Sequence, residues 1–200
     1  MLRAGGNLSE ARRKSEQALK LRNELGDQGD AAGTRIALAE LSIEEGHPKE
    51  AEAPLRQAIS ELSALKLIDD EAWAYPILAR ALLSAGEPGE ALKVIDTGSS
   101  IVAKSHIRIV HFAFAIAEAR VIAATGKPAE AVEKLRATVA EATKYGFVGY
   151  EFEGRLALGE IEMKSGNTAA GRARLAALEK EATTKGFLFI ARKAQAATGQ

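Results

Sequence analysis

The sequence predicts an all-α fold, an α-solenoid (superhelix) of antiparallel helix hairpins, and three observations carry this prediction. Apolar residues recur at helical spacing along the chain, and no segment keeps the two-residue alternation that is typical of a strand. Turn signals separate these helical stretches about every twenty residues. A glycine also returns every forty residues, at Gly6, Gly46, Gly86, Gly126 and Gly166. A fixed period of this length indicates an array of one repeated supersecondary unit.

Each of these glycines is expected to end one helix and to precede another. Gly46 suits a helix C-terminus, because glycine accepts the left-handed backbone conformation found there. Pro48 suits the first turn of the next helix, and Glu50 adds a favourable charge near that N-terminus. In two copies without the proline, Asn7 and Asn167 precede the helix, and their side chains can cap it.

The helix after each of these glycines, which we call the second-type helix, carries a small and apolar stripe. In the second copy the stripe contains Ala51, Leu55, Ala58 and Leu62. The predicted second-type helices lie near residues 8–25, 48–65, 88–104, 128–145 and 168–185. Asp96 to Ser100 is a poor helix sequence inside the third of them, where Gly98 occupies a small-residue column, so we expect close packing at Gly98.

A second column of turn residues lies twenty positions after the first, at Gly26, Lys66, His106, Gly146 and Gly186. It marks the turn into the other helix of the repeat, the first-type helix. The predicted first-type helices lie near residues 30–45, 70–85, 107–125 and 147–165. A short terminal helix near 187–197 is expected to cap the array of about four repeats, with Arg192, Lys193 and Gln195 on its polar outer face. Pro76 falls inside one of them and predicts a kink or a late start, because proline removes one backbone hydrogen bond.

The period predicts one quasi-linear domain over residues 1–200. Its repeat units are 6–45, 46–85, 86–125, 126–165 and a partial unit, 166–200. Residues 1–5 align with the tail of a first-type helix whose body is absent, so we expect a piece of a longer array or of a larger protein. The helix at 8–25 would then lack a partner on its apolar side, where self-association is expected.

Residues around the turn glycines resemble a tetratricopeptide (TPR) array over essentially the whole chain. In that family a small residue lies midway along the first helix, a position held here by Ala39, Ala79, Ala119 and Gly159. An alanine follows in the second helix, here Ala11, Ala51, Ala91 and Ala131. The family's aromatic position is poorly matched, by Arg35, Tyr75, Ala115 and Arg155. The forty-residue period also exceeds the family's usual length of about 34 residues. In this respect the chain resembles the longer variants in multidomain bacterial regulators and kinases.

The resemblance implies that first-type helices line a concave groove that binds a peptide or a partner domain. Mapping the family's columns places nine residues toward this groove: Glu40, Glu44, Trp73, Arg80, Ser84, Arg120, Glu153, Glu160 and Lys164. Trp73 is either an aromatic anchor for a partner or a residue packed between repeats.

One groove column, which reads Glu40, Arg80, Arg120 and Glu160, allows two interpretations. The two arginines could form a cationic centre for an acidic peptide or a carboxylate. Alternatively, each could pair with the glutamate of the neighbouring repeat and hold the array together, at ~0–1 kcal/mol for an exposed pair.

Composition and motifs exclude several other classes of function. Lys plus Arg and Asp plus Glu both number 27, so no charge excess favours nucleic acid or an anionic membrane. Cysteine is absent, and no histidine has the spacing of a zinc site. The string from Asp96 to Ser99 matches that of aspartic proteases, which need two carboxylates on a β-rich fold. We therefore expect no enzyme activity, no cofactor and no metal.

The apolar runs are shorter than the ~20 residues that span a bilayer, and no signal peptide is apparent, so a cytoplasmic protein is expected. The leading hypothesis is a non-catalytic protein–protein interaction module or scaffold that binds a peptide or partner domain in its concave groove. The alternative is a ligand-sensing regulatory domain of a larger signalling protein or transcription regulator.

Overall fold

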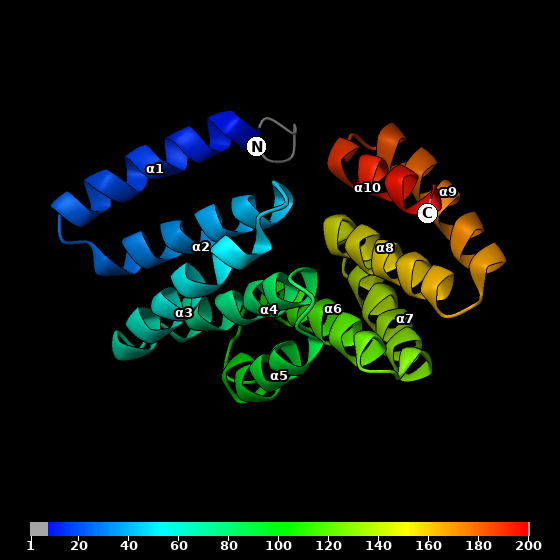
Figure 1. Cartoon of the computed structure of the whole chain (residues 1–200), viewed down its shortest axis with the longest axis horizontal. Coiled ribbons are helices and arrows are strands. Elements are labelled where there is room, and N and C mark those ends of the chain that lie inside the picture. Colours follow the sequence, from blue (N-terminus) through cyan, green and yellow to red (C-terminus); the bar gives the residue numbers. More distant parts are fainter. Residues whose placement is uncertain (1–7, 200) are drawn as a thin grey trace. The chain divides into compact units, whose positions relative to one another are not determined.

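The computed structural model describes residues 8–199, which form ten helices and no strand (Figure 1). The prediction of an all-α fold is therefore confirmed. The helices are α1 (Leu8–Glu24), α2 (Gln28–Glu44), α3 (Pro48–Ala64), α4 (Ile68–Ser84), α5 (Pro88–Val102), α6 (Arg108–Ala124), α7 (Pro128–Lys144), α8 (Val148–Lys164), α9 (Thr168–Thr184) and α10 (Leu188–Thr198). Residues 1–7, with Gly6, Asn7 and the expected helix remnant, lie outside the described residues.

The turns have the chemistry that the glycine columns predict. Gly46 follows the C-cap of α2 with a φ of 88°, a left-handed conformation that favours glycine, and Pro48 is the first residue of α3. The expectation that Asn167 caps α9 with its side chain is wrong. Asn167 is the N-cap residue, but it makes no side-chain capping bond. Its ψ of 47° lies outside the β region that capping residues usually adopt.

α4 starts at Ile68 and runs through Pro76 to Ser84, so the late start considered for this helix is wrong. Ten of its 17 residues are buried, Pro76 among them. Packing on this scale outweighs the one backbone hydrogen bond that the proline removes.

The second turn column contains two departures from glycine. Lys66 takes the left-handed conformation of the glycines in this column, with a φ of 58°. His106 does not, because the turn around it is built differently. Ser105 is buried in this turn. Its hydroxyl donates a hydrogen bond to Asp69 Oδ1 at 2.6 Å, and the same hydroxyl oxygen accepts one from the backbone N–H of Ile107 at 3.2 Å.

This contrast predicts opposite effects of glycine at the two positions. Lys66→Gly should raise the free energy of unfolding by about 0.5–1 kcal/mol, because it removes the strain of a left-handed lysine. His106→Gly should lower it by about 0.5–1 kcal/mol, because it only adds freedom to the unfolded chain. Urea denaturation of both variants measures the difference, and equal effects would contradict the turn assignment.

The described residues form two compact units, 8–117 and 118–199, and each has its own buried core. In each unit consecutive helices pack against one another, from α1 to α5 in the first and from α7 to α10 in the second. The boundary falls within α6. The prediction of a single domain over 1–200 stays a prediction. Fully buried large side chains include Leu55, Leu62, Leu78 and Leu82 in the first unit, and Leu135, Phe152, Leu158, Leu175 and Leu178 in the second.

Gly98 lies inside α5 and packs as closely as its column predicts. A Cβ added to Gly98 would lie 2.6–2.8 Å from Tyr75 Cγ, Cδ1 and Cβ. The tyrosine therefore occupies the space that a side chain at position 98 would need. Burial, and to a lesser extent the neighbouring Glu71, raise the pKa of Tyr75.

We expect Gly98→Ala to lower the free energy of unfolding by about 1–2 kcal/mol. Overpacking at this contact costs about 1–3 kcal/mol, and the better helix propensity of alanine returns up to about 1 kcal/mol. Gly89→Ala in the same helix is the control, since no atom lies within 4 Å of the added Cβ. It should leave stability unchanged or raise it by up to about 1 kcal/mol, and a loss equal to that of Gly98→Ala would contradict the packing explanation.

Candidate functional site

Three predicted groove residues meet on neighbouring helices of the first unit. Arg80 Nη2 on α4 lies 3.4 Å from Glu40 Oε1 and 3.6 Å from Glu44 Oε1, both on α2. The two glutamate side chains are 12% and 8% exposed, and that of Arg80 is 31% exposed. The arginine thus joins two first-type helices that are one period apart.

The guanidinium of Arg80 is incompletely satisfied. Its Nε is buried and has no hydrogen-bond partner. Its contact with Glu40 is long for a charge-assisted hydrogen bond, which is normally about 2.7–2.9 Å. A buried donor without a partner is costly. A small rotation of Arg80 toward a further acceptor would therefore break no strong hydrogen bond.

The second unit contains the other half of the same column. Arg120, near the end of α6, donates to Glu160 on α8, and both side chains are about a quarter exposed. Both ion pairs of the array-holding interpretation are therefore present, each within one unit. Binding of a partner by any of the nine predicted groove residues stays a prediction.

The remaining predicted site residues differ in exposure. Trp73 is half-buried on α4, and Ser84 is exposed at the last position of the same helix. Glu153 and Lys164 are exposed on α8. Among residues 8–199, no side-chain hydrogen bond or ion pair joins these four to the column of Glu40, Arg80, Arg120 and Glu160.

Sequence reasoning missed a second set of ion pairs, at the poorly matched aromatic position. Arg35 of α2 donates to Glu61 of α3. Arg155 of α8 donates to Glu181 of α9 at 2.6 Å. Each pair is separated by 26 residues, and the second repeats the first after three periods. This recurrence in the sequence could have revealed the two ion pairs. In these two repeats an arginine–glutamate bridge replaces the aromatic residue.

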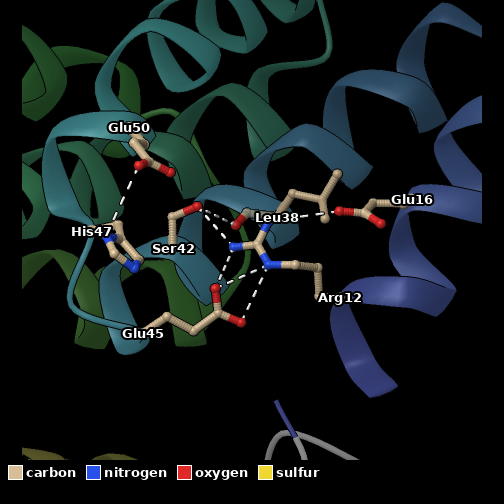
Figure 2. A network of polar contacts seen from close by, with 7 residues as sticks. All are labelled: Arg12, Glu16, Leu38, Ser42, Glu45, His47 and Glu50. Carbon is tan, nitrogen blue, oxygen red and sulfur yellow. Dashed lines mark hydrogen bonds and ion pairs between the residues drawn. The ribbon is translucent and has the colours of Figure 1, made fainter. Parts of the chain in front are cut away.

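α1 has no buried residue, and polar contacts join both of its ends to α2 and the turn after it. Figure 2 shows Arg12 of α1 directed at Glu45 and Ser42. Its Nη2 lies 2.6 Å from Glu45 Oε2 and 3.0 Å from Ser42 Oγ. The hydrogen bond to Glu45 raises the pKa of Arg12. Arg22, at the other end of α1, donates to the Asp30 carbonyl at 3.0 Å and to Thr34. Self-association through α1 stays a prediction.

The motifs set aside in the sequence lie in regular structure. Asp96 to Ser99 is part of α5, and the hydroxyls of Thr97 and Ser99 donate to carbonyls of their own helix. Within residues 8–199, no group of three or more His, Cys, Asp or Glu side chains is placed to hold a metal ion. The same stretch contains no helix with the length and apolarity needed to cross a bilayer.

Comparisons with known proteins identify the fold. No family model and no curated protein matches the sequence. Two crystal structures of a Podosopora anserina putative kinesin light chain with nearly identical TPR-like repeats, one of them carrying the Q17M change, match the structure. The Q17M structure has a TM-score of 0.60 and the other 0.58. Each is 21% identical to this chain, and each match covers 92% of this chain and 91% of the other.

These likenesses show that the chain has a TPR-like repeat fold, as the glycine period and the small-residue columns predict. Stacked repeats of this kind form extended concave surfaces.

Proposed function

We propose that this protein is a non-catalytic interaction module that binds a peptide or a segment of a partner protein. The binding surface is the face of α2 and α4 that carries Glu40, Glu44, Trp73, Arg80 and Ser84, which we call the α2/α4 face. The observation that carries the proposal is the incompletely satisfied guanidinium of Arg80, which has a buried Nε without a partner beside two long ion pairs.

The residues around Arg80 provide complementary binding chemistry. Trp73 lies two helical turns before Arg80 on α4 and is half-buried, and an aromatic residue of this kind can serve as an anchor. Ser84 lies one turn after Arg80 and is exposed. A partner that offers a carbonyl or carboxylate oxygen to Arg80 and an apolar side chain to Trp73 would match both features. At 3.4 Å the contact of Arg80 with Glu40 is longer than a good charge-assisted hydrogen bond, so a closer acceptor can compete with it.

Trp73 is the only tryptophan of the chain, so its fluorescence reports on this face. Peptides selected from a random display library against the full chain should change the Trp73 emission on titration. Arg80→Ala should weaken their binding about tenfold, the effect of losing a contact worth more than 1 kcal/mol. Ser84→Arg, which adds bulk at an exposed position, should weaken the binding similarly.

Arg13→Ala, an exposed arginine on α1, is the matched control and should bind as the parent does. Circular dichroism of each variant verifies that the helices are intact. Selected peptides that bind the Arg80 and Ser84 variants with parental affinity would show that the α2/α4 face is not the binding surface.

The finer expectations from the sequence stay predictions. They include a groove that continues over all nine predicted residues, the ligand-sensing alternative, the origin in a bacterial regulator or kinase, and the cytoplasmic location.

A further inference from the structure

The second unit contains a surface hollow between its last two helices. Its volume is about 310 Å³, and α9 and α10 lie side by side along it (Figure 1, orange and red). Its lining residues are Glu179 and Thr183 of α9, and Leu188, Ala191, Arg192 and Gln195 of α10. Leu188 is one of the exposed large apolar side chains, and Ala191 is buried. We call this hollow the α9/α10 groove.

The forty-residue period shows what covers the equivalent positions one repeat earlier. The counterparts of Leu188 and Arg192 on α8 are Val148 and Phe152. Both belong to the apolar cluster that also contains Leu175, Leu178 and Ala182 of α9. These positions of α8 are thus covered by α9 and α10 of this chain. The same positions of α10 therefore present a face on which another helix can pack.

The side chains of the α9/α10 groove differ from those of its counterpart in one decisive way. Arg192 stands where α8 has the fully buried Phe152, and Gln195 stands where α8 has Arg155. Arg192 is exposed and forms no ion pair within residues 8–199, although its guanidinium lies 6.0 Å from the Phe189 ring. α10 also carries Lys193 and has no acidic residue.

We propose that the α9/α10 groove is a docking site for an amphipathic helix that bears an acidic residue opposite Arg192. The helix would lie on α10 as α9 lies on α8, with its apolar side on Leu188 and Ala191. The acid is required because an apolar residue placed against Arg192, as α9 places its leucines against Phe152, would desolvate a charge without a partner. This surface is separate from the α2/α4 face and does not depend on it.

The charges of the groove favour a helix over an anionic lipid surface. Arg192 is cationic, but Glu179 on the opposite wall is acidic and makes no side-chain ion pair among the described residues. A helix can present an acid to Arg192 and a polar or basic residue to Glu179, because residues three or four positions apart share one face. A uniformly anionic surface would meet Glu179 with repulsion.

The test uses the full chain and two fluorescein-labelled helical peptides of 17 residues, a length copied from α9. Both peptides carry the same Ala and Leu stripe, and the residue facing Arg192 is Glu in one and Lys in the other. Fluorescence anisotropy should show that the Glu peptide binds at least tenfold more tightly than the Lys peptide. Arg192→Glu should reverse this preference, because it inverts the charge at the contact. Leu188→Ser should weaken both peptides.

Arg172→Glu is the matched control, since it makes the same charge change at an exposed position of α9 that does not line the groove. It should leave both affinities unchanged, and the α2/α4 variant Ser84→Arg should do so as well. If Arg172→Glu and Arg192→Glu had equal effects, the net charge of the chain would explain the binding, and the proposal would be overturned. The proposal would also be overturned if the two peptides bound with equal affinity, or if anionic vesicles bound more tightly than the Glu peptide. Displacement of the peptide by a second copy of the chain at high protein concentration would overturn it as well.

Discussion

Replacing Phe152 by alanine is expected to lower the free energy of unfolding by about 3–5 kcal/mol. The ring is fully buried in the apolar cluster between α8, α9 and α10. It packs edge-on against Phe187, with ring centroids 5.2 Å apart. The cationic groups of Arg155 and Lys185 each lie 5.4 Å from its centroid. The substitution therefore leaves a cavity and also removes an aromatic pair and two cation–π contacts.

Tyr145→Ala provides the control for this prediction. Tyr145 is an exposed aromatic residue of the same unit, and Lys144 lies over its ring at 5.4 Å. Its loss should change stability by less than about 1 kcal/mol, because little buried surface is removed. Thermal and urea denaturation of both variants measure the contrast. Similar losses in the two variants would show that the cluster around Phe152 does not dominate the stability of this unit.

Replacing Arg174 by methionine is expected to lower the free energy of unfolding by about 3 kcal/mol. This is the lower end of the about 3–5 kcal/mol observed when one partner of a buried ion pair is removed. Glu162 of α8 is 4% exposed at its side chain and accepts two hydrogen bonds from Arg174 of α9, at 2.9 and 3.1 Å. The substitution keeps an apolar stem of similar length but leaves the carboxylate buried without its cation. Urea denaturation at neutral pH measures the loss.

A double-mutant cycle separates the buried charge from simple packing. Glu162→Met with Arg174→Met removes both charges, and the double variant should recover most of the stability lost in Arg174→Met, because two apolar residues can replace a buried pair at little cost. Lys93→Met is the exposed control, since Lys93 pairs with Glu90 on the surface of α5 and should contribute less than about 1 kcal/mol. Additive losses in the cycle would contradict the role assigned to the Glu162 charge.

The helices and turns were predictable because their chemistry is local. A glycine that takes a positive φ and a proline at the first helical position act within a few residues, so their spacing locates most helix ends to within two positions. α4, predicted at 70–85 and observed at Ile68–Ser84, is typical. The contact between Arg120 and Glu160 was also accessible, because both residues lie in one column and exactly one period separates them.

The contacts that the sequence did not reveal join different columns or depend on side-chain direction. The pair of Arg35 and Glu61 joins two different columns, 26 positions apart, and only its recurrence three periods later, at Arg155 and Glu181, signals it in the sequence. The repeat pattern does not single out Arg12, whose guanidinium contacts Glu45 just after the end of α2. The α9/α10 groove could not be predicted either, because exposure of Leu188 depends on which helices surround it.

The arginine contacts of α1 have a consequence for how this helix responds to solution conditions. Because α1 has no buried residue whereas α4 has ten, undocking of α1 should carry a smaller heat-capacity change and a smaller denaturant m-value than loss of a core helix. The contact of Arg12 with Glu45 and that of Arg22 with Asp30 are instead weakened by dissolved ions. Ionic strength is therefore expected to change how often α1 leaves α2.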